Sequence, residues 1–583
     1  MPTLEWIGKE KVVNHHLEVP YRVLERKYSF DENGQTEADN GSENMIIHGD
    51  NLEALKSLLP QYEGRVKCIY IDPPYNTGNE GWVYNDNVND PHIKAWLNKT
   101  VGKEGEDLSR HDKWLCMMYP RLKLLQKLLA EDGAIFISID DAEYANLKLI
   151  CDEIFGSNCF VSNISWQRTY STRNDSKGIV NEVEHIVVYS KQPGWNPNKL
   201  PRTAEMDSKY KNPDNDRTLW RTDNAFAPGG ATHQGMVYAI QHPFTGKMLY
   251  PANGRHWTFG QDQMLEIMRG WCSYELRDLN DAHERAVVCG IPESDVRQGV
   301  QAIVLSEPLE ISAQKARTVY DRGQWPRFFF TKGGKGGIAR KTYLDNVGGK
   351  LPTNFWPFSE TGHTDEAKKE MLAIFDGKAT FDTPKPHRLI EFVLKVAGSK
   401  DSLILDSFAG SGTTAHAVLN MNKADGGHRK FILVEMGDYA DSITAERVKR
   451  VIHGYGEGKN AVPGTGGNFS FYELGEPLMN GDVLNENVGV DKIREYVYFT
   501  DTKTPLPESS PEEPYLMGVH VNSAYYFYYE KQSVTTLNRQ FLHNVKTKAD
   551  AYVIYADLCT LSDTELEKYH ITFKKIPRDI TKL

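Results

Sequence analysis

Four consecutive residues have the types and order needed to hold an aromatic amine for reaction. Asp72, Pro73, Pro74 and Tyr75 follow the short β-rich run CIYI. The Asp72 carboxylate and the Pro73 carbonyl can accept the two N–H groups of an exocyclic amine, which favours an sp³-like nitrogen that attacks a methyl sulfonium in line. The prolines fix the carbonyl direction, and Tyr75 offers a ring face for a base extruded from its stack. The segment indicates orientation and electrostatic stabilisation; the alternative interpretation is a plain turn at a strand end.

A second segment, DSFAGSGTT at residues 406–414, is rich in small residues and lies between the runs SLILD and TTAHAVLNM. Small residues let a cofactor approach the backbone at the carboxyl end of a strand, where open α/β sheets bind ligands. Glu435 ends the following strand pattern and is suited to hydrogen-bond a ribose. The spacing is not GxGxxG, and no Lys follows the glycines as in a P-loop. Alone, this segment predicts an adenosine-containing cofactor or a tight turn.

The segments around both motifs alternate between strand and helix patterns. Residues 45–50, 66–72, 134–140, 402–406 and 430–435 have strand patterns. Helix patterns cover residues 51–62, 119–133, 386–398 and 413–421, and Gly133 is expected to end the second of them. This alternation predicts an α/β fold with a largely parallel, doubly wound sheet.

The remaining regions differ in composition. Residues 1–44 are polar and end in DENGQTEADNGSEN, which predicts an arm or linker. From about 161 to 350 Gly, Pro, Asn and Asp are frequent, which indicates an inserted domain with long loops. Residues 471–583 contain β-rich runs and a polar linker. We therefore predict a core of residues 45–190 and 380–470, an insertion at 191–379 and a C-terminal domain at 471–583.

Composition sets the broad class. A chain of 583 residues predicts roughly two to four domains. The fractions of apolar (40%) and charged (25%) residues are those of an ordinary globular protein. No apolar run is long enough to span a membrane, and the start lacks the apolar core of a signal peptide, so we expect a cytoplasmic protein. The seven cysteines show no CxxC pattern, which predicts buried free thiols and no metal site.

Charge is unevenly distributed. The net charge of −11 argues against a nucleic-acid partner, but phosphate binding depends on local Lys and Arg. Residues 311–350 carry nine basic side chains against Asp321 and Asp345, a local charge of +7, with aromatic residues between them. A solvated loop face is the alternative interpretation. The nine basic residues are Lys315, Arg317, Arg322, Arg327, Lys332, Lys335, Arg340, Lys341 and Lys350.

Together the two motifs resemble the amino-methyltransferases. Because Asp-Pro-Pro-Tyr precedes the glycine segment by more than 300 residues, the order is similar to the permuted β class of DNA amino-methyltransferases. The segments IIHGDNLEAL, EHIVVYSK and FDTPKPHRLI also resemble parts of this class. GHTDEAKKEMLAIF and the C-terminal runs YVIYADLCTLSD and ITFKKIPRDI look most similar to the Mod subunits of type III restriction–modification systems.

The resemblance implies roles for individual residues. Three of the residues expected to contact the cofactor have alternative interpretations. Phe408 could pack in the core, Asp50 could be a helix N-cap, and Lys385 could lie in an exposed turn. The expected target-base residues are Asp72, Pro73, Pro74 and Tyr75. The residues expected to bind S-adenosylmethionine are Asp406, Phe408, Ala409, Gly410, Ser411, Gly412, Thr413, Glu435, Asp50 and Lys385. The residues expected to bind DNA are Arg322, Arg327, Lys332, Lys335, Arg340 and Lys341.

The resemblance also implies a Rossmann-like methyltransferase core, mostly parallel with one antiparallel strand, an inserted target-recognition domain and a small C-terminal α+β domain. The implied activity is methyl transfer from S-adenosylmethionine to N6 of a flipped adenine in duplex DNA, without a metal. The implied partners are duplex DNA, a second copy of the chain and a helicase–nuclease restriction subunit, with no membrane. The alternatives are a cytosine-N4 or RNA-adenine methyltransferase and a catalytically idle DNA-recognition subunit, with a nicotinamide dehydrogenase last.

Overall fold

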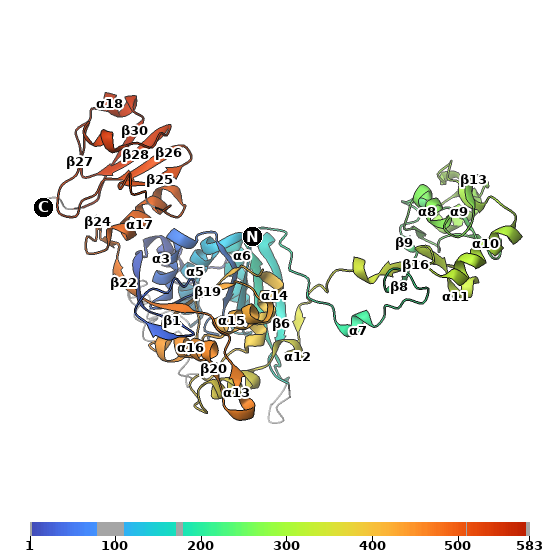
Figure 1. Ribbon diagram of the computed structural model, residues 1–583, viewed down its shortest axis with the longest axis horizontal. Coiled ribbons are helices and arrows are strands. Elements are labelled where there is room, and N and C mark those ends of the chain that lie inside the picture. The colour runs from blue at the N-terminus through green and yellow to red at the C-terminus, as the bar shows by residue number, and fades with distance from the viewer. Residues whose placement is uncertain (1–2, 78–109, 171–178, 509, 579–583) are drawn as a thin grey trace. The chain divides into compact units, whose positions relative to one another are not determined.

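The computed structural model describes residues 3–77, 110–170, 179–508 and 510–578 (Figure 1). The chain divides into two compact units. Unit 1 comprises Met1–Asn198 and Pro352–Leu583, and unit 2 comprises Lys199–Leu351. Each unit is described separately.

Unit 1 is built around one large sheet, which has eleven strands in the described part of the chain. All neighbouring strands are parallel except at β7 and β1, which run against the others. The mostly parallel α/β core is therefore confirmed, with one antiparallel strand more than the resemblance implies. The strand order is β17 (Phe355–Trp356), β6 (Phe160–Gln167), β7 (Val183–Ser190), β5 (Leu129–Ile139), β4 (Val66–Ile71), β18 (Leu403–Asp406), β19 (Lys430–Glu435), β3 (Met45–His48), β22 (Phe469–Pro477), β1 (Arg22–Asp31) and β2 (Gly34–Thr36).

Two groups of helices cover this sheet. The first group is α3 (Asn51–Tyr62), α5 (Arg110–Leu128) and α6 (Tyr144–Phe155). The second is α12 (Phe358–Thr361), α14 (His387–Ala397), α15 (Thr413–Asp425) and α16 (Glu446–His453). Successive strand residues face opposite sides of a sheet. Ile69 and Ile71 of β4 pack in the hydrophobic cluster of the first group, and Cys68 and Tyr70, which alternate with them, are buried outside it. Burial of both faces explains the continuous apolar runs.

The neighbouring strands β4, β18, β19 and β3 all end at the same edge of the sheet, because each pair is parallel. Asp72 follows β4, Asp406 ends β18, Glu435 ends β19, and Asp50 lies two residues beyond β3. This edge therefore gathers the acidic residues that the two motifs place far apart in sequence.

The N-terminal segment is a correction to the sequence prediction. Instead of an arm or linker, it forms α1 (Lys9–Val12), α2 (His15–Glu18) and the sheet strands β1 and β2. Tyr28 and Phe30 alternate inward from β1 and pack on Phe469 and Phe471 of the neighbouring strand β22. The interpretation failed because these two aromatic residues are surrounded by charged and polar ones, which dominate the composition.

Unit 2 has its own hydrophobic core, which includes Trp257, Trp271 and the β15 residues Phe328, Phe329 and Phe330. The two ends of the unit are joined, because Leu200 and Lys350, each one residue inside its boundary, exchange two backbone hydrogen bonds of 2.8 Å each. Its main elements are α8 (Gln261–Met268), α9 (Ala282–Cys289), α10 (Leu309–Arg322), the sheet β11 (Met248–Leu249), β10 (Ile240–Gln241), β14 (Ala302–Leu305), β13 (Tyr274–Arg277), and the sheet β15 (Phe328–Phe330), β16 (Ile338–Tyr343), β8 (Trp220–Asp223).

Unit 2 is shorter than the insertion predicted at residues 191–379. Residues 352–379 lie in unit 1, because β17 continues the large sheet beside β6 and α13 (Thr364–Ile374) contacts α16. The ring of Trp356 in β17 packs against Phe392 of α14, with 4.7 Å between the ring centroids. The two-residue strand β17 is too short to give a periodic signal in the sequence.

The C-terminal part of unit 1 forms a smaller α+β element group. Its sheet has the order β25 (Leu516–His520), β26 (Ser523–Phe527), β28 (Ala551–Ala556) and β30 (Ile571–Lys575), with α17 (Val490–Thr502) and α18 (Asp563–Lys568). Three of these strands coincide with β-rich runs of the sequence, and β22, which opens the segment, belongs to the large sheet instead. Within the described residues, no helix combines the length and apolarity required to cross a bilayer.

The buried ion pair of unit 2 gives a stability prediction. The Lys341 side chain is 0% exposed and its ammonium contacts the carboxylates of Asp214 and Asp216. Lys341→Met leaves both acids without their cation, and we expect a loss of about 3–5 kcal/mol in the free energy of unfolding. Lys247→Met, at an exposed lysine of the same unit, is the control and should change stability by less than about 0.5 kcal/mol. Urea unfolding curves that coincide for the two variants would contradict a structural role for Lys341.

Candidate active site

The Asp-Pro-Pro-Tyr segment is held in place by α5. The buried Trp114 donates its indole N–H to the Pro74 carbonyl at 2.6 Å. Asn76, which follows Tyr75, has a φ of 57° and donates its side-chain amide to the Arg110 carbonyl at 3.0 Å. Asn tolerates this left-handed conformation better than most residues. The path of the chain after β4 is therefore fixed by specific partners rather than by the prolines alone.

One lysine binds the acidic and aromatic residues of this segment together. The Lys385 ammonium donates to both oxygens of Asp72 and to the Tyr75 hydroxyl, each at 2.8 Å. The Tyr75 hydroxyl in turn lies 2.8 Å from an oxygen of Asp72 and 3.2 Å from one of Glu184. Arg168 donates to the other oxygen of Glu184 at 2.9 Å.

The charges of this cluster explain its pKa shifts. Burial raises the pKa of Asp72, and the Lys385 charge and its hydrogen bond oppose that rise. Burial lowers the pKa of Lys385, but the charges of Asp72 and Glu184 outweigh it, so the net direction is upward. Lys385 therefore stays protonated, and burial leaves Asp72 with an unusually high proton affinity although Lys385 opposes it.

The glycine segment wraps tightly around the start of α15. Gly410 and Gly412 have φ values of 52° and 81°, in the left-handed region where glycine is favoured. A Cβ on Gly412 would lie 2.9 Å from the carbonyl oxygen of Thr444. The Thr444 hydroxyl donates to the Gly410 carbonyl at 2.6 Å. The loop is therefore built against the π-helical turn Ala440–Ala445, which leaves its other side open to a ligand.

Two buried carboxylates flank this loop. Asp406 accepts from the Thr414 hydroxyl at 2.6 Å and from the Phe408 N–H at 3.1 Å. Glu435 accepts from the backbone N–H groups of Gly410 and Gly437 at 2.7 and 2.9 Å. Burial outweighs these hydrogen bonds and raises the pKa of each acid to about 7. Both acids are therefore ready to gain stabilisation from a ligand that donates further hydrogen bonds.

A single cavity of about 430 Å³ joins the two motifs. Its volume is in the range of ordinary small-molecule sites. Asp72, Pro73 and Tyr75 line one part of it, and residues of the glycine loop line another. The cavity can thus hold a nucleoside-sized ligand beside the loop and a second planar group beside Tyr75. Its other lining residues include Asp140, Arg168, Glu184, Phe381 and Lys385.

Residues 66–446, more than half of the chain, match the family described as DNA methylase. The chain belongs to this family.

The chain is also similar to individual proteins of known kind. It is 34% identical over 440 residues to the StyLTI Mod subunit, from a type III restriction-modification enzyme of Salmonella typhimurium, covering 70% of this chain and 57% of that one. It is 28% identical to the EcoPI Mod subunit of Escherichia phage P1, covering 74% and 63%. It is 30% identical to the type II methyltransferase M.KpnI of Klebsiella pneumoniae, covering 70% and 84%. The chain thus matches only about three fifths of the length of the two Mod subunits.

Ten of the residues expected to bind the base or the cofactor line the cavity, and four do not: Pro74, Gly412, Glu435 and Asp50. Pro74 accepts a hydrogen bond from Trp114, and Gly412 passes so close to the Thr444 carbonyl that no side chain fits there. Glu435 contacts the glycine loop through the Gly410 N–H. Asp50 is the N-cap of α3, where its carboxylate accepts from the Leu52 and Glu53 N–H groups. The expected residues that line the cavity are Asp72, Pro73, Tyr75, Lys385, Asp406, Phe408, Ala409, Gly410, Ser411 and Thr413.

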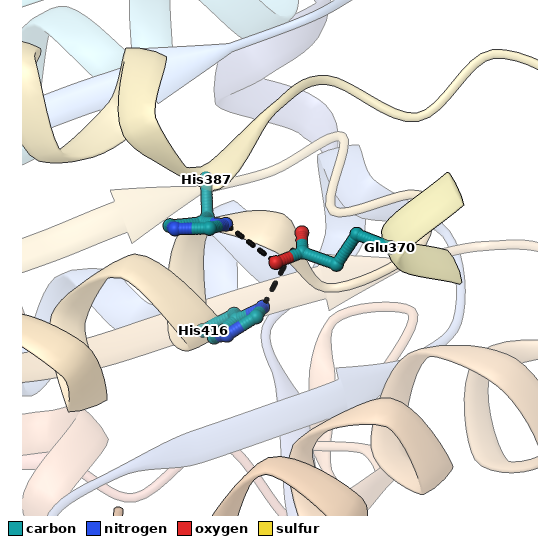
Figure 2. A group of neighbouring side chains, drawn as sticks. All are labelled: Glu370, His387 and His416. Carbon is teal, nitrogen blue, oxygen red and sulfur yellow. Dashed lines mark ion pairs between the residues drawn. The ribbon is translucent and has the colours of Figure 1, made fainter. Parts of the chain in front are cut away.

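Arg447 braces the glycine loop, and three further residues that the sequence did not indicate, Glu370, His387 and His416, cluster around it. The Arg447 guanidinium donates to the hydroxyls of Ser411 and Thr413, both at 2.8 Å, and is 0% exposed. Its other nitrogen lies 3.2 Å from Glu370 and 3.1 Å from His416 Nδ1. Figure 2 shows the His387 and His416 rings directed at the Glu370 carboxylate. These residues span more than 70 positions, so no local pattern could have connected them.

Glu370, His387 and His416 are of residue types that bind metal ions, and their ligand atoms lie within 4.8 Å of one another. Among the described residues, this is the group that is compact enough to hold an ion. Burial lowers the pKa of His416 well below its usual value, so its ring is neutral and accepts from Arg447. Burial opposes ionisation of Glu370, but the hydrogen bond and charge of His387 and the charge of Arg447 lower its pKa to about 2. Because the guanidinium already supplies the positive charge, we assign the cluster to support of the loop.

The six residues of unit 2 that were predicted to bind DNA differ in their exposure. Lys341 is a correction to the predicted DNA-binding set, because it is fully buried against Asp214 and Asp216 and cannot reach a phosphate. Arg340 is paired with Asp223 at 2.9 Å. The four that are exposed are Arg322, Arg327, Lys332 and Lys335.

The two glycines that flank α15 provide a matched test of the loop's tight contact. Gly412 is the N-cap and Gly426 the C-cap, and both have positive φ. Replacing either by Ala costs about 1–2 kcal/mol of backbone strain. Only Gly412→Ala also forces a Cβ against the Thr444 carbonyl, which we expect to add about 1–3 kcal/mol, because nothing lies within 4 Å at Gly426. If Gly412→Ala and Gly426→Ala lower the free energy of unfolding in urea by the same amount, the close contact at Gly412 does not contribute to stability.

Proposed function

We propose that this methylase transfers a methyl group from S-adenosylmethionine to N6 of an adenine in duplex DNA. The observation that carries the proposal is that the Asp72–Tyr75 segment and the glycine loop line one cavity. Asp-Pro-Pro-Tyr supplies acceptors for an amine, and the loop supplies close backbone approach for a nucleoside cofactor. Membership of the DNA methylase family supports this assignment.

The residues around the loop fit S-adenosylmethionine. Gly410 has no side chain to block the loop, and the buried acids Asp406 and Glu435 are acceptors for donors such as ribose hydroxyls and a positively charged amino group. The Ser407 hydroxyl is buried and has no hydrogen-bond partner within the described structure. When bound, S-adenosylmethionine supplies an electrophilic methyl group. The protein's task is then to bind it, exclude water and aim an amine at it.

Asp72 performs the orienting step in this proposal. Its carboxylate and the Pro73 carbonyl accept the two N–H groups of the amine, so that the nitrogen lone pair is directed away from the ring of the base. Tyr75 stacks on the extruded base. As the nitrogen gains the methyl group it loses a proton, and the high proton affinity that burial gives Asp72 makes its carboxylate a suitable acceptor.

DNA recognition is proposed for unit 2. Arg322, Arg327, Lys332 and Lys335 are exposed and suited to contact phosphates. The similarity to two Mod subunits of restriction-modification enzymes supports a restriction subunit as partner, and a second copy of this chain stays a prediction of the family resemblance. The similarity to M.KpnI, of which 84% is covered and whose name mentions no subunit, supports a methyltransferase of a single kind of chain. Copurification of the chain from its native host, followed by mass measurement, separates these two arrangements.

The first test of the proposal is single-molecule sequencing of DNA from cells that express the chain. We expect N6-methyladenine at one short sequence, and none with Asp72→Ala, because that variant loses the acceptor for the amine. Cofactor binding, measured by calorimetry, controls for folding of the variant and should persist. Methylated cytosine at N4 would reassign the target base. Unmodified DNA together with intact cofactor binding would favour an idle recognition subunit.

The pKa of Glu435 predicts how cofactor binding depends on pH. Its ionised form accepts hydrogen bonds from ribose hydroxyls, so binding is expected to lower a pKa that burial has raised to about 7. Affinity should therefore rise about tenfold between pH 6 and pH 8. Glu435→Gln should bind more weakly and show a smaller rise, with Asp406 responsible for what remains. Calorimetry at both pH values measures this, and equal wild-type affinities would refute the assignment.

A further inference from the structure

The carboxylate proposed to accept the target amine is already used within the chain. Lys385 donates to both oxygens of Asp72 at 2.8 Å. Its Nζ also donates to the Tyr75 hydroxyl at 2.8 Å, at the edge of the ring on which a base would stack. An amine therefore competes with the Lys385 ammonium for Asp72, and full access to the carboxylate requires the ammonium to move away.

The structure also provides a place for the displaced ammonium. Glu184 Oε2 lies 3.7 Å from Lys385 Nζ, beyond hydrogen-bond distance but close enough to attract the charge. Glu184 projects from β7 and is nearly buried, with a side chain 7% exposed. Arg168 holds its other oxygen at 2.9 Å, so the carboxylate is anchored on the far side. A shift of about 1 Å would convert the ion pair with Glu184 into a direct hydrogen bond.

We propose that Lys385 is a displaceable counter-ion, which occupies Asp72 while the base pocket is empty and transfers to Glu184 when the target amine binds. This inference rests on the proposed function, since it assumes an amine-bearing base at Asp72. Lys385 and Glu184 are positioning residues in this scheme: neither forms a bond with the substrate, and no covalent step is added.

The transfer solves an electrostatic problem of the buried site. A bare carboxylate in this environment is costly, and replacing its cation by a neutral amine would leave Asp72 without charge compensation. Moving the ammonium by a short distance keeps it near both acids. The charged or titratable groups that face Asp72 are Tyr70, Tyr75, Glu184, Lys385 and Asp406.

A double-mutant cycle with Glu184→Gln and Lys385→Met tests the proposal. Glu184→Gln removes the destination, so Lys385 should remain on Asp72 and the DNA concentration for half-maximal methyl transfer should rise about tenfold. Loss of a negative charge alone would tighten DNA binding, which is the opposite direction. In the Lys385→Met background nothing has to be displaced, and Glu184→Gln should have no such effect.

A second readout does not require methyl transfer. Once the target adenine is mapped, 2-aminopurine placed next to it reports extrusion of the adenine by a rise in fluorescence, without cofactor. We expect Glu184→Gln to reduce this rise and Lys385→Met to increase it. Lys385→Met should also slow methyl transfer at pH 7 and recover it at higher pH, because loss of the neighbouring cation raises the pKa of Asp72 further.

The outcomes separate the two proposals. If the wild-type chain methylates no DNA, the proposed function fails. If it does, but Glu184→Gln raises the DNA concentration for half-maximal methyl transfer equally with and without Lys385, the movement of the ammonium to Glu184 is refuted. Calorimetric cofactor binding verifies that each variant is folded, and Lys385→Gln replaces Lys385→Met if the latter is not.

Discussion

The parallel pairing of β4 with β18 is the interaction on which the site depends. It aligns Cys68 with Ile404 and Ile69 with Leu405, which are more than 300 residues apart in sequence. Because both strands run in the same direction, the residues that follow them emerge at one edge. An insertion of any length between the two strands leaves this alignment unchanged, provided that its ends return to the sheet. The chemistry is therefore local in space although its parts are remote in sequence.

Buried acidic side chains, whose ionisation is unfavourable, also lie at that edge. Asp406 and Glu435 are buried with pKa values of about 7, which means that keeping them ionised near neutrality costs free energy. Elsewhere the protein offsets such costs internally, as Arg447 does for Glu370. Under the proposed function, a bound cofactor supplies the compensation that the first two acids lack. Stability and binding are thus opposed at the same residues, as is usual at functional sites.

The sequence was sufficient to predict the α/β core and the two motifs, because Asp72–Tyr75 and the glycine loop carry local patterns with a chemical rationale. It was insufficient wherever a role depends on a distant partner. Trp114 and Arg447 support the motifs from other helices, and nothing in their own neighbourhoods indicates this. The prediction that Lys341 binds DNA was wrong for the same reason, because the sequence shows its charge but not its burial against Asp214.

The hydrogen-bonded pair formed by Leu200 and Lys350 closes unit 2 at its base. An inserted segment whose two ends are tied together imposes almost the same entropy cost whatever its length, since each doubling of a loop adds only about 0.6 kcal/mol. The large sheet of unit 1 is thereby insulated from changes in the inserted unit. Such an architecture allows the inserted unit to diverge rapidly, or to be exchanged between chains, while the reacting groups remain under separate selection.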